Sequence, residues 1–166
     1  MVINYLHKIG WFVGLVLLQV LILNNVNIAG YATPFLYIYL LVKFESDTPR
    51  NTLMLWAFFL GLAVDVFSDT PGMNAAAAVL LAFMRPLLLR LFVPRDTLDV
   101  LVPAVHSMGV FPFLKYLIAG VLVHHGMLLT LEFFSFAHVG VLLLRILAST
   151  LLSVACLMAV EGIKKK

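Results

Sequence analysis

Charged residues and cysteine are scarce in this chain. Only 11% of its 166 residues are charged and Cys156 is the one cysteine, whereas 63% are hydrophobic and the mean hydropathy is +1.09. A single cysteine excludes an internal disulfide framework and a cysteine-based metal site, so Cys156 is interpreted as a small core residue. So little charge also excludes a water-soluble domain, because too much of its surface would be apolar. The sequence therefore predicts an integral membrane protein.

Catalytic signatures are absent as well. The chain has no Gly-x-Ser-x-Gly, no His-Glu-x-x-His, no P-loop and no Gly-rich dinucleotide fingerprint. His124 and His125 are adjacent, so on a helix they point about 100° apart and do not form a zinc pair on one face. The net charge of +3 lies in short loops and a lysine tail, which indicates membrane topology rather than nucleic-acid binding. We expect no enzyme, no cofactor or metal, and no nucleic-acid partner.

Six apolar stretches approach the roughly 20 residues that a helix needs to cross a bilayer. Further spans follow the first one directly, so we expect it to be retained rather than cleaved as a signal peptide. The sequence predicts one all-α domain over residues 1–166, an integral membrane bundle of six transmembrane helices. The expected helices cover residues 9–26, 28–42, 52–67, 73–93, 109–133 and 138–160.

Lysine and arginine are distributed unevenly between alternate loops, which predicts the orientation. The loops after the first, third and fifth expected helices contain neither residue type. Both termini are therefore expected in the cytoplasm, and the protein is expected to be multi-pass. The opposite side carries Lys8, Lys43, Arg50, Arg95 and the terminal lysines.

Several ionisable residues are expected in the outer third of the bundle. Asp65 should lie about one turn, roughly 5 Å, below the outer end of its helix, and Arg145 about two turns below the same surface. His124 and His125 fall in a similar band. The first interpretation is a structural layer in which Asp65 pairs with Arg145 and fixes helix register. The alternative is a proton relay or a cation site.

The turn that follows Asp65 allows two interpretations of its carboxylates. Asp65 and Asp69 are spaced i, i+4, and paired carboxylates can hold Mg²⁺ or share a proton. Residues 68–72, however, contain Pro71 and Gly72 and have the composition of a turn, in which Asp69 would be a turn and N-capping residue. We favour the turn. The alanines at 75–78 predict a close helix contact, because small residues let helices approach in lipid.

Three cations in the inner half have two open interpretations. Arg85, Arg90 and Lys115 can extend toward the cytoplasmic headgroups, because their stems are apolar and their heads charged. A contact with protein is the alternative for each of them.

One stretch, GLAVDVFSDTPGMNAA, resembles the rod shape-determining protein MreD family of bacterial inner membranes. That family has a similar pattern of glycine, aspartate, Phe-Ser, a Pro-Gly turn and small residues, although here proline and glycine are adjacent where a spacer is expected. The number of predicted spans and the length of the chain are similar too. The residues that carry the resemblance are Gly61, Asp65, Phe67, Ser68, Pro71, Gly72, Asn74, Ala75 and Ala76.

The resemblance implies a non-enzymatic scaffold of the elongation machinery that maintains rod shape and supports peptidoglycan synthesis. The implied direct partner is MreC, with MreB, RodA and a class B penicillin-binding protein in the same complex and lipids around it. The hairpin of residues 61–76 would then contact a partner helix. The resemblance also implies similarity to the S-component fold of energy-coupling factor transporters. A vitamin-binding S component is accordingly the alternative function.

Overall fold

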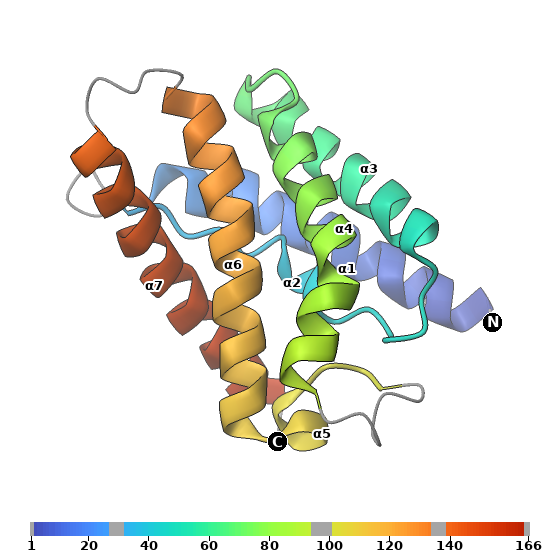
Figure 1. Cartoon of the computed structure of the whole chain (residues 1–166). Helices are drawn as coiled ribbons and strands as arrows, with labels where there is room; N and C mark the ends of the chain where they lie inside the picture. The colour runs from blue at the N-terminus through green and yellow to red at the C-terminus, as the bar shows by residue number, and fades with distance from the viewer. Residues whose placement is uncertain (1, 27–31, 94–100, 134–138, 165–166) are drawn as a thin grey trace.

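The structure, a computed structural model, describes residues 2–26, 32–93, 101–133 and 139–164 (Figure 1). Five stretches within them are helical, long and apolar enough to cross a membrane. The described part of the chain is thus a multi-pass helical bundle. Its long helices are α1 (Val2–Leu21), α3 (Arg50–Ser68), α4 (Met73–Phe92), α6 (Val110–Phe133) and α7 (Val139–Lys164), and its short ones are η1 (Leu23–Asn25), α2 (Tyr39–Val42) and α5 (Val105–Met108).

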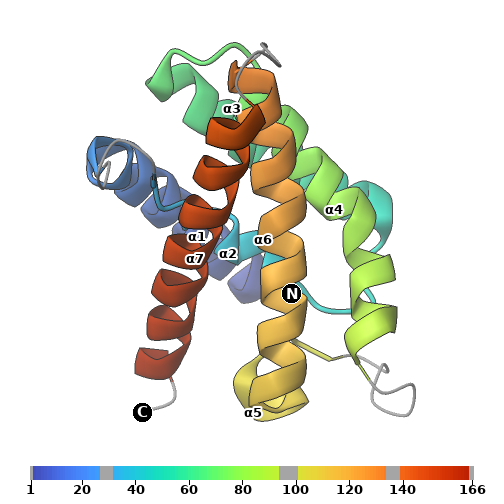
Figure 2. The same cartoon turned by 60° about the vertical axis from the view of Figure 1, so that its left-hand side comes forward.

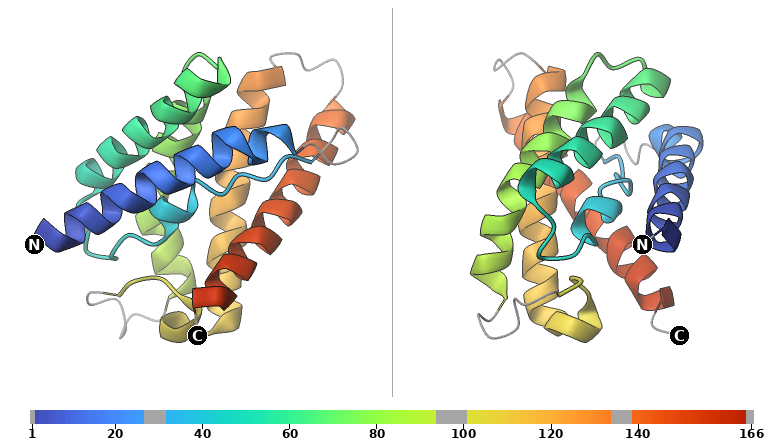
Figure 3. Two further views of the ribbon diagram at one scale, coloured as in Figure 1. Left: turned by 180° about the vertical axis from the view of Figure 1, so that it is seen from behind. Right: turned by 90° about the vertical axis from the view of Figure 1, so that its right-hand side faces the viewer.

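The long helices pack in chain order on one side of the molecule. Helices α3 and α4 form an antiparallel hairpin, α4 packs on α6, and α6 packs on α7 (Figure 2). Helix α1 crosses the back of the bundle obliquely and contacts α3 (Figure 3). The α3–α4 turn lies at the top of Figure 1, and we call this the hairpin end. Helix α5 lies at the opposite end.

The helix expected over residues 28–42 is not present, which corrects the prediction of six helical spans. Residues 27–31 lie outside the described part, residues 32–38 are not helical, and only the four residues of α2 are. Pro34 disfavours a helix through residue 33, because the residue before a proline avoids the helical conformation. The N–H groups of Phe35 and Leu36 bind side chains of α7 and α1 instead. Residues 32–44, here called the buried segment, pass through the middle of the bundle and are almost completely buried.

The buried segment runs along nearly half the length of α7. Its start lies beside Ser149 of α7, and Lys43 at its end lies beside Glu161 of the same helix. Twelve residues of helix separate these two contacts, which is about 18 Å. The segment therefore crosses the interior of the bundle without forming a sixth long helix among the described residues.

Side chains supply the hydrogen bonds that a helix would have supplied to this backbone. Ser149 and Ser153 Oγ accept from the N–H groups of Thr33 and Phe35, at 3.2 and 2.9 Å. Gln19 Oε1 accepts from Leu36 N–H at 2.8 Å, and Gln19 Nε2 donates to the Pro34 carbonyl at 3.0 Å. Irregular backbone is tolerated at membrane depth only where protein satisfies its polar groups in this way.

Cations gather at the end opposite the hairpin turn, which we call the basic end. Lys43 Nζ contacts both carboxylate oxygens of Glu161 at 2.9 and 3.0 Å, and Lys8 Nζ lies 3.7 Å from Glu45 Oε2. Arg90 and Lys115, at the adjoining ends of α4 and α6, are exposed. Among the lysine and arginine side chains that the structure describes, Arg145 is the one that lies at the hairpin end.

Candidate functional site

Gly61 sets the distance between the two helices of the hairpin. A Cβ at this position would lie 2.5 Å from Ala75 Cα and 2.6 Å from the Asn74 carbonyl oxygen. Backbone atoms cannot move aside as a flexible side chain could, so only glycine permits this approach. Ala77 and Ala78 are completely buried on the same helix. The small residues predicted to mark a close contact therefore pack inside this molecule, while Ala76 is half-buried.

Asp65 caps the N-terminus of α4 from the neighbouring helix. Its Oδ1 accepts from Asn74 N–H at 3.0 Å and from the Thr70 hydroxyl at 2.7 Å, and its Oδ2 accepts from Ala75 N–H at 2.9 Å. The first N–H groups of a helix have no partner within it and carry partial positive charge. The buried carboxylate is thus stabilised by backbone donors.

The predicted ion pair between Asp65 and Arg145 is wrong. The contacts of Asp65 all lie within the hairpin, and no ion pair joins the two residues in the part of the chain that the structure describes. The prediction failed because it considered only side chains as partners for the carboxylate. The backbone of α4 neutralises Asp65 instead.

Residues 68–72 form the predicted turn, but Asp69 does not cap α4. Asp69 adopts a left-handed conformation with φ of +54° at the C-terminal end of α3, and Gly72 has φ of +78° just before α4. Aspartate tolerates the left-handed region better than most residues, and glycine adopts it freely. Asp69 is therefore a turn residue as predicted, but the capping role expected of it belongs to Asp65. Phe67, at the end of α3, is 64% exposed.

A chain of buried polar side chains runs from the hairpin to α7. Asn74 Nδ2 donates to Asp65 at 3.0 Å, and the Tyr37 hydroxyl lies 3.1 Å from Asn74 Oδ1 and 2.5 Å from His124 Nε2. The two histidine Nδ1 atoms are 3.4 Å apart, and His125 Nε2 lies 3.1 Å from Ser153 Oγ. The predicted polar layer thus contains Asp65 and both histidines but is joined by residues not singled out from sequence, Tyr37 and Ser153.

The hydrogen bonds of this chain assign the protons on both imidazoles. His125 Nδ1 lies 2.9 Å from the Val121 carbonyl, which can only accept, so Nδ1 carries the proton. If the Tyr37 hydroxyl donates to Asn74, His124 Nε2 donates to Tyr37. The Ser153 hydroxyl, which is both a donor and an acceptor, completes the bonding of His125 at Nε2. The described residues hold no group of three or more metal-ligating side chains.

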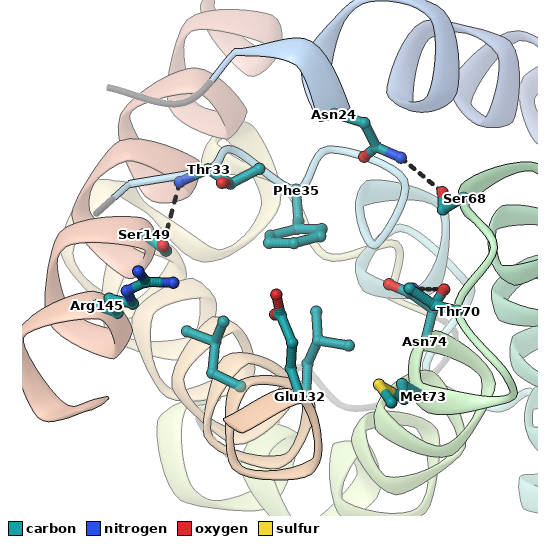
Figure 4. Close-up of a pocket in the computed structure, with 12 residues that line it drawn as sticks. Asn24, Thr33, Phe35, Ser68, Thr70, Met73, Asn74, Glu132, Arg145 and Ser149 are labelled. Atoms are coloured by element: carbon teal, nitrogen blue, oxygen red, sulfur yellow. Dashed lines mark hydrogen bonds between the residues drawn. The ribbon is translucent and has the colours of Figure 1, made fainter. Parts of the chain in front are cut away.

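A polar pocket of about 310 Å³ opens at the hairpin end (Figure 4). Glu132 of α6 points into it below Phe35, with Arg145 of α7 on one side and Asn74 on the other. The two charges are not joined by an ion pair among the described residues. Glu132 escaped the sequence analysis because it lies at the end of a long apolar run. Hydroxyl and amide groups of Asn24, Thr33, Ser68, Thr70 and Ser149 complete the polar lining.

Arg85 is buried and bonded to protein, which decides between its two predicted roles. Its guanidinium donates to the carbonyls of Val42, Phe44 and Glu45, and Nε lies 3.1 Å from the Tyr116 hydroxyl. These carbonyls lie at and just beyond the C-terminus of α2, where no helical donor is available. Arg85 therefore does not reach the headgroups, whereas Arg90 and Lys115 are exposed.

A shallow apolar groove follows the outer face of the α3–α4 hairpin. Its volume is about 540 Å³, and the small residues Gly72, Ala75 and Ala76 line it between the rings of Phe58 and Phe83. Both rings are more than 40% exposed. The hairpin thus has a tightly packed inner face and an open outer face.

Comparison of the chain with protein-family models, with curated proteins and with solved structures finds no match.

Proposed function

We propose that this protein is a non-enzymatic scaffold of the MreD type in the bacterial inner membrane, where it binds MreC and supports peptidoglycan synthesis during elongation. The observation that carries the proposal is the rigid hairpin, because the residues of the resemblance are the ones that build it. Gly61 brings the helices together, Asp65 locks the start of α4, and residues 68–72 close the turn.

The outer groove is the proposed contact for the single transmembrane helix of MreC. Helices associate in lipid where small residues allow close backbone approach, and Ala75 and Ala76 provide such a floor between Phe58 and Phe83. Since the inner face of the hairpin is already packed, the partner helix would lie on the outer one. MreB, RodA and a class B penicillin-binding protein would join through the same complex.

The distribution of charge supports the proposed orientation. Lys8, Lys43, Arg90 and Lys115 lie toward one end of the bundle, and cytoplasmic ends of membrane proteins are enriched in such residues. If the buried segment counts as a sixth crossing, as the six spans expected from the sequence require, both termini would be cytoplasmic.

The scaffold proposal is tested by filling the groove. Ala76→Leu should abolish co-purification with MreC from the same membranes, because its side chain would occupy the floor of the groove. Gly140→Leu is the matched control, since Gly140 lies on α7 with open space around it. Both variants should unfold at the wild-type temperature. Retention of MreC by folded Ala76→Leu would overturn the proposed contact.

The polar pocket supports the second candidate, a small-molecule-binding S component. Its charged and amide lining is what a polar ligand needs, and sites of this kind are concave with a few convergent polar groups. A vitamin panel should then stabilise the purified protein against heat, and Arg145→Gln should remove that effect. Adjacent genes provide a further test, because MreC and a penicillin-binding protein would favour the scaffold and an ATPase pair the transporter.

A further inference from the structure

Two adjoining hollows follow α1 at the basic end. The first, about 520 Å³, lies along Gly10, Gly14 and Leu18, and the second, about 220 Å³, lies between Lys8, Lys43 and neighbouring aromatic rings. His7 and Trp11 line both hollows, so the two lie side by side on α1. We propose that together they bind one anionic phospholipid, its acyl chain along Gly10 and Gly14 and its phosphate at Lys8 and His7.

The first hollow has the shape and length of a site for an acyl chain. Gly10 and Gly14 are one turn apart on the same face of α1, and a Cβ at either position would meet nothing within 4 Å. From His7 to Leu18 the helix rises about 16 Å. That length, measured along the oblique axis of α1, is similar to the roughly 15 Å that one leaflet contributes to a hydrocarbon core of about 30 Å.

The second hollow offers donors to a phosphate. Lys8 Nζ lies 3.7 Å from Glu45 Oε2, which is beyond hydrogen-bonding distance, and its side chain is 26% exposed. His7 Nε2 accepts from Trp11 Nε1 at 3.0 Å, so the ring carries its proton on Nδ1 and can donate it. Lysine and tryptophan are also residue types that anchor proteins at the membrane interface.

The net charge around the second hollow favours an anionic lipid over a zwitterionic one. The charged side chains that line the hollow are Lys8, Lys43 and Glu45, two cations and one carboxylate, so the lining itself has a charge of +1. Lys43 also binds Glu161, which lies outside the lining, whereas Lys8 Nζ is beyond hydrogen-bonding distance of Glu45. Basic pockets between membrane helices bind anionic headgroups for this reason.

The proposal is tested by native mass spectrometry and thermal unfolding of the purified full chain with phosphatidylglycerol or phosphatidylcholine of identical acyl chains. The wild type should bind phosphatidylglycerol about tenfold more tightly than phosphatidylcholine, and its unfolding temperature should be higher with phosphatidylglycerol. Lys8→Gln should remove most of that preference. Gly14→Leu should weaken the binding of both lipids, because the leucine fills the hollow. The variant should still fold, because nothing lies within 4 Å of a Cβ at this position.

Two controls separate a built site from general attraction to a basic surface. Lys115→Gln removes an exposed cation elsewhere at the basic end, and Gly140→Leu adds a leucine far from α1. Neither should change lipid binding. Equal binding of both lipids by the wild type, or equal losses in Lys8→Gln and Lys115→Gln, would overturn the proposal. Stabilisation by glycerol phosphate as large as that by the intact lipid would also overturn it, because the acyl chain would then contribute nothing.

Discussion

Asp65 at the hairpin end and Arg85 at the basic end are buried charges of opposite sign with the same kind of partner. Asp65 accepts from N–H groups at the start of α4, and Arg85 donates to carbonyls at the end of α2. They differ in how far along the chain those groups lie. The donors to Asp65 are nine and ten residues away, whereas the carbonyls bound by Arg85 are 40 to 43 residues away. One charge stabilises a local hairpin, and the other holds the buried segment in the bundle.

Replacing Arg85 should have the largest effect on stability. Arg85→Met leaves three carbonyls and the Tyr116 hydroxyl without their donor, and we expect a loss of about 4 kcal/mol in the free energy of unfolding. Reversible unfolding in a denaturing detergent measures it. Arg90→Met, which changes an exposed arginine on the same helix, should unfold like the wild type. Similar curves for both variants would show that the buried contacts of Arg85 contribute little.

Replacing Asp65 should have a somewhat smaller effect, because the groups it caps are nearer the end of the bundle. Asp65→Ala should lower the free energy of unfolding by about 3 kcal/mol, since two N–H groups and the Thr70 hydroxyl lose their acceptor. The same unfolding assay applies, with Asp69→Asn as a control that keeps a residue tolerant of positive φ.

A charge exchange sharpens the interpretation of Asp65. The variant with both Asp65→Arg and Arg145→Asp should be no more stable than Asp65→Arg alone, because the native carboxylate binds backbone donors. A double variant restored to wild-type stability would mean that the two side chains do pair.

Gly61→Ala should lower the free energy of unfolding by about 2 kcal/mol, because the added Cβ would contact backbone atoms of α4 and force the two helices apart. Gly126→Ala is the matched control. Gly126 lies within α6 with open space around it, and alanine there should stabilise the helix by up to about 1 kcal/mol. A double-mutant cycle with Asp65→Ala should show coupling, since separated helices also break the cap.

Tyr37→Phe should have the smallest effect, a loss of about 1 kcal/mol in the free energy of unfolding, because it removes the hydroxyl that lies between Asn74 and His124. Nitrogen-15 NMR of histidine side chains provides a more specific measurement. Loss of the hydroxyl should change the signal of His124 Nε2 and leave that of His125 Nδ1, which binds the Val121 carbonyl, nearly unchanged. Unchanged signals at both rings would show that the chain of hydrogen bonds is broken at Tyr37.

Hydropathy located each long helix but not the buried segment, and it misplaced the bounds of α1, which begins seven residues before and ends five residues before the expected 9–26. The prediction of residues 52–67 agrees with α3 to within two residues, and that of 109–133 agrees with α6 to within one. Residues 28–42 are just as apolar, but Pro34 disfavours helix and Gln19, Ser149 and Ser153 supply hydrogen bonds from elsewhere. Hydropathy does not report whether such distant partners exist.

The sequence predicted several charged residues of the candidate site, but it did not predict which residues they contact. Asp65, His124 and Arg145 stand out in apolar runs, and the structure places all three toward the hairpin end. Tyr37 joins two of them through Asn74 and was not predictable, because a tyrosine in an apolar stretch also fits ordinary core packing. Glu161, which binds Lys43 and Tyr39, was missed although it is charged, because it lies at the end of a long apolar run where an exposed carboxylate is ordinary.

Composition and periodicity were enough to identify a membrane chain, its long helices and the turn between α3 and α4, because these depend on properties of neighbouring residues. The partners of Asp65 and Arg85, the non-helical buried segment and the polar pocket depend on which helix ends and side chains meet in space. Every residue carries the same backbone N–H and C=O groups, except that proline lacks the N–H, so sequence does not distinguish those that remain free to bind a buried charge. Packing exposes a few of them at helix ends, and these neutralise the two charges.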